Sequence, residues 1–218
     1  MVRSGVKLKM NRKEIKSKAK EIAFKNKWNI WKPYLVIYSV TFVLGFILGI
    51  LNIDSESTLG LILTLGIEVA IIPMSFGYMY YLIKLVDGEV MDVKEALLSK
   101  YKIFGLIIIV SLVVAICTTL WTLLFIIPGI IYAYKVIMTS MILADTADEN
   151  TSYKQVINTS KEMMDGYKFD YFVFELSFIG WSLLCIITLG IALIWVYPYF
   201  QIANVMYYKE LKKLKNIK

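Results

Sequence analysis

The 218-residue sequence contains no histidine, only two cysteines and only four prolines. Histidine is the commonest metal ligand and the commonest general base near neutral pH, so its absence argues against many enzyme classes. Cys117 and Cys185 lie alone within apolar runs and behave as small buried hydrophobes, so neither a disulfide framework nor a metal pair is implied. No G-x-S-x-G nucleophile motif occurs. We therefore expect no catalytic residue, no metal and no cofactor, and a protein that is not an enzyme.

Charged residues are also scarce, at 19%, whereas hydrophobic side chains make up 58% and the mean hydropathy is +0.64. This composition is typical of membrane proteins. Apolar runs recur with about the 20 residues that a helix needs to cross the hydrocarbon core. A cleaved signal peptide is not expected, because about 30 polar, lysine-rich residues precede the first apolar run and no small-residue cleavage site follows it.

The apolar runs predict an all-α, polytopic membrane protein with six transmembrane helices arranged as three hairpins. Residues 1–32 form a basic amphipathic N-terminal helix, 33–208 the transmembrane domain and 209–218 a basic cytoplasmic tail. The predicted spans are Pro33–Ile53, Leu59–Ile83, Ile103–Ile127, Gly129–Ala144, Tyr171–Leu189 and Ile191–Tyr208.

Proline indicates where these helices begin and bend. Pro33 suits the first turn of the first span, and Pro128 opens the fourth, so that Pro128–Gly129 is the turn of a hairpin. Pro73 and Pro198 fall within the second and sixth spans, where each removes a backbone hydrogen bond and should kink its helix.

The basic residues are distributed on one side of the predicted spans. Of the 24 lysines and arginines, 23 fall within residues 1–32, 84–102, 145–169 and 209–218, and the exception is Lys135. The positive-inside rule then places both termini in the cytoplasm, in a multi-pass plasma-membrane protein. Anionic membrane lipid is the expected partner of these segments, and nucleic acid is not. Each basic residue near an anionic membrane surface contributes about 1 kcal/mol to the free energy of binding.

Three of these basic segments resemble one another, which suggests a threefold repeat. Each begins with a helix-capping pair, continues with apolar residues at helical spacing and ends with an aromatic residue before a span. The second and third predict interfacial helices near 91–101 and 151–166. The alternative is that connectors between membrane helices commonly acquire this pattern. The capping pairs are Asn11 with Glu14, Asp92 with Glu95, and Ser152 with Gln155.

Ionisable residues within the spans are candidates for function because they are costly in hydrocarbon. Glu68 lies roughly 13 Å into the second span and Lys135 roughly 10 Å beyond Pro128, so the two could pair at similar depth. The alternative for Lys135 is that its long side chain reaches the membrane surface.

Further polar residues complete the candidate intramembrane site. Gln201 and Asn204 follow Pro198 and could face the same interior as Glu68, although such amides often bind only a neighbouring helix. Asp170 and Glu175 are secondary candidates near the start of the fifth span, for which we expect structural roles.

Several motifs resemble an uncharacterised family of bacterial integral membrane proteins, domain of unknown function family 975. The stretches are "RKEIKSKAKEIAFKNKW", "LWTLLFIIPGI", "MILAD", "ELSFIGW" and "TLGIALIWVYPY". The family is distantly similar to the membrane domain found with some glycerophosphodiester phosphodiesterases. The resemblance implies a multi-pass membrane protein and no established activity. Family members often carry a lysine near the position of Tyr132, whereas this chain has it at Lys135.

Two functional hypotheses follow. The first is a non-enzymatic membrane protein that organises or senses the inner leaflet, or binds a partner there, through its basic segments. The second is a small transporter, channel or lipid-moving protein that uses Glu68 and Lys135.

Overall fold

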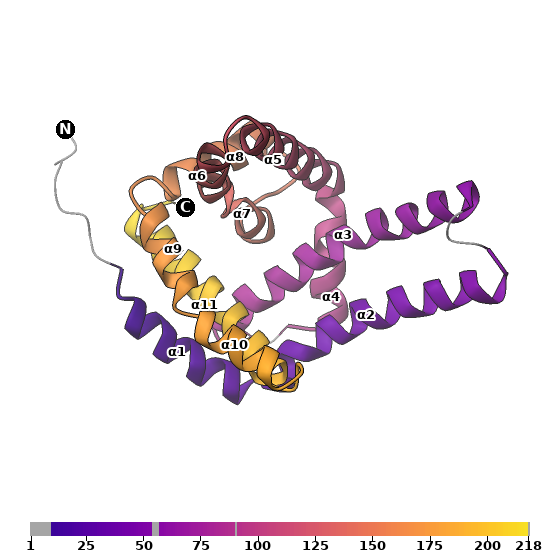
Figure 1. Cartoon of the computed structure of the whole chain (residues 1–218), viewed down its shortest axis with the longest axis horizontal. Helices are drawn as coiled ribbons and strands as arrows, with labels where there is room; N and C mark the ends of the chain where they lie inside the picture. Colours follow the sequence, from indigo (N-terminus) through magenta and orange to yellow (C-terminus); the bar gives the residue numbers. More distant parts are fainter. Residues whose placement is uncertain (1–9, 54–56, 90, 218) are drawn as a thin grey trace.

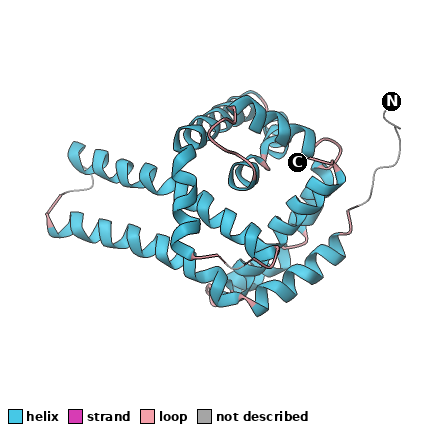
Figure 2. Ribbon diagram, turned by 180° about the vertical axis from the view of Figure 1, so that it is seen from behind, coloured by secondary structure: helices cyan, strands magenta, loops and turns pink. Residues whose placement is uncertain are grey.

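A computed structural model of the protein describes residues 10–53, 57–89 and 91–217. Within these ranges every regular element is a helix, as the all-α prediction requires (Figures 1 and 2). The elements are α1 (Arg12–Lys25), α2 (Lys27–Ile50), α3 (Thr58–Val86), α4 (Val93–Leu98), the 3-10 helix η1 (Ser99–Ile103), α5 (Phe104–Leu124), α6 (Ile126–Val136), α7 (Thr139–Asp145), α8 (Tyr153–Met163), α9 (Lys168–Leu176), α10 (Ile179–Ile187) and α11 (Leu193–Leu214).

Five helical stretches of the described residues are long and apolar enough to cross a membrane, which indicates a membrane protein. They are Lys27–Ile50, Thr58–Val86, Val93–Leu124, Ile126–Asp145 and Lys168–Ile187. The sixth predicted span, Ile191–Tyr208, falls on α11, which is not among them. Tyrosine, glutamine and asparagine side chains lower the hydropathy of α11, and many of its residues are buried against other helices instead of facing outward. A six-span topology therefore stays a prediction.

Several predicted boundaries are wrong. The first span begins at Lys27, so Pro33 lies inside α2 and not in its first turn. The fourth span is two helices, because the chain turns at Ile137 and Met138 between α6 and α7. Residues 209–214 of the predicted basic tail continue α11 without a break, and the cytoplasmic position of this segment stays a prediction. Apolar periodicity does not report the break between α6 and α7, because the residues on both sides of it are apolar.

The turn of the second hairpin also lies three residues before the predicted Pro128–Gly129. Phe125 has the extended backbone between α5 and α6, so Pro128 and Gly129 lie in the first turns of α6. Proline is tolerated there because those N–H groups have no partner within the helix. Gly129 has a packing role: a Cβ at this position would lie 2.3 Å from Thr122 Oγ1 and 2.6 Å from Thr122 Cα. The glycine therefore allows α6 to approach α5 closely.

The short helices join the hairpins in a cyclic order. Helix α4 packs on α3, and α8 packs on α7, so each contacts the second arm of the hairpin that precedes it in the chain. Helix α1 packs in the same way on α11, the last arm of all, which closes the arrangement (Figure 1). The α2–α3 hairpin projects from this ring, and α7 lies inside it. The order of contacts is the one that a repeat would give, and the repeat itself stays a prediction.

The predicted caps form at two of the three short helices. Asn11 Oδ1 accepts the backbone N–H of Glu14, and Asp92 Oδ2 accepts those of Lys94 and Glu95. Ser152 precedes α8 without such a bond. Each short helix buries one side, with Ile15, Ala19 and Ala23 in α1, Ala96 and Leu97 in α4, and Val156, Ile157, Ser160 and Met163 in α8. The interfacial position that the sequence predicts for them remains a prediction.

Helix α1 is held against the third hairpin by polar contacts as well. Lys16 donates to the backbone carbonyl of Ser177 at 3.3 Å and to its hydroxyl at 3.0 Å, and its ammonium lies 5.0 Å from the centre of the Phe178 ring. Partial burial at this contact lowers the pKa of Lys16 below its ordinary value. The N-terminal helix is therefore docked on the ring.

Candidate functional site

The structure does not bring Glu68 and Lys135 together. Glu68 is exposed on α3, in the projecting α2–α3 hairpin, and forms no ion pair among the described residues. Lys135 is partly buried at the end of α6, beside α8. The proposed pair does not form, because α6 packs on α5, α8 and α9, whereas Glu68 is exposed on the α2–α3 hairpin. The intramembrane site built on that pair is not formed.

The other polar candidates bind neighbouring helices. Tyr171 donates to Asn204 Oδ1 at 3.0 Å within the core. Tyr134 donates to Glu175 Oε2 at 2.7 Å, and Tyr207 donates to Asp170 Oδ2 at 3.0 Å. These bonds link α6, α9 and α11, so the observed roles of Asn204, Asp170 and Glu175 are structural.

The remaining candidates lie within continuous helices. Gln201 is partly buried on α11, one turn after Tyr197 on the same helix. Pro73 and Pro198 are buried, and neither interrupts its helix. None of these three residues lines a cavity with Lys135.

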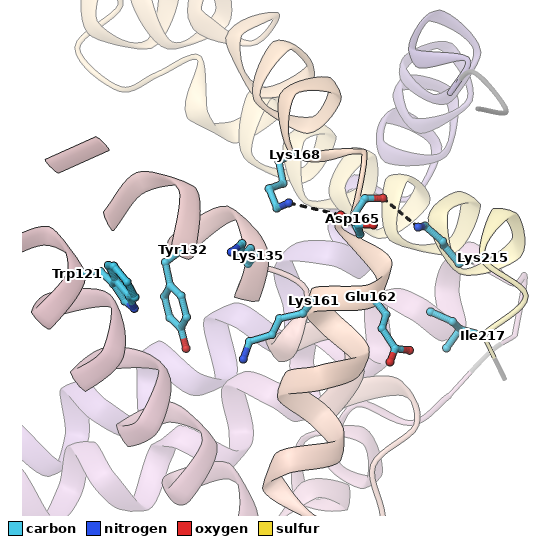
Figure 3. Close-up of a pocket in the computed structure, with 9 residues that line it drawn as sticks. All are labelled: Trp121, Tyr132, Lys135, Lys161, Glu162, Asp165, Lys168, Lys215 and Ile217. Carbon is cyan, nitrogen blue, oxygen red and sulfur yellow. Dashed lines mark hydrogen bonds and ion pairs between the residues drawn. The ribbon is translucent and has the colours of Figure 1, made fainter. Parts of the chain in front are cut away.

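Lys135 instead lines a cavity of about 680 Å³ in which side chains from four helices, the α8–α9 connection and the C-terminal segment meet (Figure 3). We call this cavity the lysine pocket. Its lining residues are Trp121, Tyr132, Lys135, Lys161, Glu162, Asp165, Lys168, Lys215 and Ile217. These residues are far apart in the sequence, and only Lys135 among them was a predicted site residue. Together they form one basic site.

Local structure explains how two of these lysines reach the pocket. Ser160 on α8 donates to the backbone carbonyl of Lys135 at 3.1 Å and so ties the end of α6 to α8. At the C-terminus, Asn216 has a left-handed φ of 51°, and the N–H of Ile217 bonds to the carbonyl of Lys212. This is the Schellman arrangement that commonly ends a helix. It turns the chain after Lys215, so that Lys215 and Ile217 both line the pocket.

The lysines of the pocket differ in how they are neutralised. Lys168 forms an ion pair with Asp165 at 3.8 Å, and Lys215 donates to the backbone carbonyl of Asp165 at 2.9 Å. The ammonium of Lys161 lies 5.9 Å from the centre of the Tyr132 ring. Lys135 has no ion pair and no side-chain hydrogen bond within the described part of the chain. Four ammonium groups face two carboxylates, a net charge of 4 − 2 = +2.

The arrangement of charges in the lysine pocket suits the binding of an anion more than it suits catalysis. Ammonium groups from separate helices can donate charge-assisted hydrogen bonds to one oxyanion. A general base or nucleophile would need a partner that activates it, and the two carboxylates of the pocket have no histidine, cysteine or serine beside them in its lining. Among the described residues, no three metal-ligating side chains cluster.

The sequence singled out Lys135 but not the three lysines beside it. The charge distribution could have identified them, because Lys161, Lys168 and Lys215 all belong to basic segments predicted to lie on the same side of the membrane. Lys135 was the one basic residue outside those segments in the prediction. In the structure it lines the same pocket as the other three lysines.

A second polar group surrounds the C-terminal half of α11 and is structural. An aspartate from each hairpin contacts this helix: Asp87 pairs with Lys209, Asp145 with Lys212, and Asp170 with Tyr207. Asp87 follows the first hairpin, Asp145 ends the second and Asp170 lies at the start of the third. Helix α11 therefore connects the three hairpins.

Comparison with known proteins gives one match. Residues 124–215 match the model of a family described as "Protein of unknown function (DUF975)". No curated protein and no solved structure matches the chain. The matched stretch includes α6 to α11 and most residues of the lysine pocket, whereas the comparisons do not extend the resemblance to the phosphodiesterase-associated membrane domain. The resemblance noted in the sequence is thereby confirmed over residues 124–215, which are similar to the uncharacterised family 975, whereas the match does not reach the N-terminal stretch.

Proposed function

We propose that this protein is a multi-pass membrane protein of the plasma membrane that binds anionic lipid of the inner leaflet in the lysine pocket, and so organises or senses that leaflet. Both termini lie in the cytoplasm under this proposal, and the protein is not an enzyme. Membrane lipid is its partner, and nucleic acid is not.

One observation carries the proposal. Lys135, Lys161, Lys168 and Lys215 come from four different segments and line a single cavity next to apolar helices. Basic pockets between membrane helices on the cytoplasmic side are characteristic binding sites of anionic headgroups. The alternative, a transporter built on Glu68 and Lys135, lacks comparable support because the two residues lie apart.

The aromatic lining fits the same function. Trp121 and Tyr132 lie side by side at one end of the pocket, from α5 and α6, and the lysines lie toward α8, α9 and α11 (Figure 3). Tryptophan and tyrosine favour the boundary between hydrocarbon and water. A bound lipid would therefore place its phosphate near the lysines and its chains along the apolar α5–α6 hairpin.

Lys135→Met should weaken retention of anionic lipid. Each basic residue near an anionic surface contributes about 1 kcal/mol, which corresponds to roughly a fivefold change in affinity. The full chain is reconstituted in nanodiscs of phosphatidylcholine with a minor fraction of phosphatidylglycerol, and lipid retained on extraction into detergent is measured by native mass spectrometry. The wild-type protein should retain the anionic lipid preferentially, and the variant should retain several-fold less.

Lys154→Met is the matched control. Lys154 lies on α8, like Lys161, but is exposed and does not line the pocket. The control should retain as much anionic lipid as the wild type. No preference for phosphatidylglycerol over phosphatidylcholine in the wild-type protein would contradict the proposed function.

A further inference from the structure

The charge and the donors of the lysine pocket indicate which headgroup it binds. We propose that the lysine pocket is a site for a phosphomonoester, a phosphate with one ester bond and three terminal oxygens, as in a lipid of the phosphatidic acid type. The inference rests on the proposed function, and names the ligand class of the same site.

The charge balance favours a dianion. The pocket has a net charge of 4 − 2 = +2, and Lys135 has no counter-charge among the described residues. A phosphomonoester carries a charge of about −1.5 to −2 near pH 7, whereas a phosphodiester carries a single charge. A monoester therefore comes closer to neutralising the pocket, and a partly buried charge without a partner is costly.

The geometry of the donors favours the same ligand. Lys135 and Lys161 belong to different helices, α6 and α8, and the Tyr132 hydroxyl lies on the same side of the cavity as the Lys161 ammonium in Figure 3, so three donors reach this part of the cavity from different directions. Three terminal oxygens can accept from three such donors at once, whereas a phosphodiester offers two oxygens and a second substituent.

The carboxylates of the pocket limit where the phosphate can lie. Asp165 is occupied by Lys168, whereas Glu162 forms no ion pair in the described part of the chain and points toward Ile217 in Figure 3. An anion is repelled by Glu162 and is best placed on the other side, between Lys135 and Lys161 and near Tyr132. A zwitterionic headgroup could place its ammonium at Glu162, but it would leave the net positive charge of the pocket in place.

A lipid is the expected source of the phosphate. The aromatic end of the pocket adjoins the outward-facing surface of the α5–α6 hairpin, where Leu120, Leu124 and Ile131 are exposed by 46% or more. Acyl chains can pack on this apolar surface, whereas a soluble phosphate compound has no apolar chain that would contact it. The phosphomonoester chemistry is common to both sources, and competition separates them.

The test compares two lipids in the full chain. Nanodiscs of phosphatidylcholine contain an equal minor fraction of dioleoyl phosphatidic acid and dioleoyl phosphatidylglycerol, and native mass spectrometry measures the retained lipid. At about pH 7.5 the wild type should retain phosphatidic acid roughly fivefold better, the difference expected for one further charge. At about pH 5.5 the preference should shrink, because the second pKa of a phosphomonoester is near 6 while the lysines stay protonated.

Variants assign the preference to the pocket. Lys135→Met should abolish the discrimination, Lys135→Arg should keep most of it, and Lys154→Met should leave it unchanged. If Lys135→Met does not elute as a monodisperse protein, Lys161→Met serves in its place. Displacement of the retained lipid by millimolar glycerol 3-phosphate would support the site but assign it to a soluble ligand, against the proposed function.

Three results overturn the inference. Equal retention of both anionic lipids at both pH values would show that the pocket binds anionic lipid without distinguishing a phosphomonoester from a phosphodiester, and the proposed function would survive. An equal loss of discrimination in Lys154→Met would assign it to general surface charge. Absence of any anionic preference would contradict both proposals together.

Discussion

Gly77→Ala is expected to lower the heat resistance of the protein more than any other single methyl group added to a glycine of α3. A Cβ at Gly77 would lie 2.5 Å from the carbonyl oxygen of Ala96, 2.6 Å from that of Leu97 and 2.7 Å from Leu97 Cα. All three atoms belong to the backbone of α4, whose Ala96 and Leu97 are fully buried, so no side chain can move aside. Overpacking of this kind costs about 1–3 kcal/mol.

The measurement is the fraction of monodisperse protein after heating in detergent, followed by size-exclusion chromatography. Gly66→Ala is the control, because Gly66 lies on the same helix and has no atom within 4 Å of a new Cβ. In that open position alanine favours the helix by up to about 1 kcal/mol. The two variants should therefore shift in opposite directions, and equal midpoints would show that α4 does not pack on Gly77 as described.

Asp145→Ala is expected to have the second largest effect, because Asp145 joins the end of α7 to α11. Tyr208 donates to Asp145 Oδ2 at 2.9 Å, and Lys212 donates to the same oxygen at 2.6 Å. Tyr208 is buried, so removal of the carboxylate leaves its hydroxyl without this partner. Hydrogen bonds to charged groups contribute about 1.5–3 kcal/mol, and the lower part of that range applies because Asp145 and Lys212 are partly exposed.

The same heating assay measures this variant against two others. Asp145→Asn keeps an acceptor for Tyr208 but loses the charge that faces Lys212, so its midpoint should lie between those of the wild type and Asp145→Ala. Glu149→Ala removes an exposed carboxylate that forms no ion pair in the described residues, and should leave the midpoint unchanged. A wild-type midpoint for Asp145→Ala would contradict a stabilising role for this contact.

Most of the secondary structure could be predicted from local patterns. Apolar runs of sufficient length identify the helices that can cross a membrane, and the capping residues Asn11 and Asp92 mark the starts of α1 and α4. These patterns act between residues three or four apart, so they need no tertiary context. The turn was predicted at Pro128–Gly129 because proline followed by glycine is a strong turn signal. The structure instead has the turn at Phe125, and Gly129 allows close packing against Thr122.

The candidate site could be predicted only in part. Lys135 was recognised because a charge within an apolar run is costly. Its partner was sought at equal depth in a neighbouring straight helix, which gave Glu68, but α6 packs on α8 and so places Lys135 beside Lys161 instead. Lys215 lies 80 residues further along the chain and enters the pocket through a helix-terminating turn, which no local pattern connects with Lys135.

The sequence by itself determined the membrane class, the helical hairpins, the order of short helices between them and the segregation of basic residues, because each depends on composition or on spacing within a few turns. Tertiary structure alone decided that α1 closes on α11, that three aspartates meet that helix, and that Lys135 joins three other lysines. The reason is geometric. These contacts join residues far apart in the chain, such as Lys135 and Lys215, and hydropathy and charge along the chain do not specify which helices pack together.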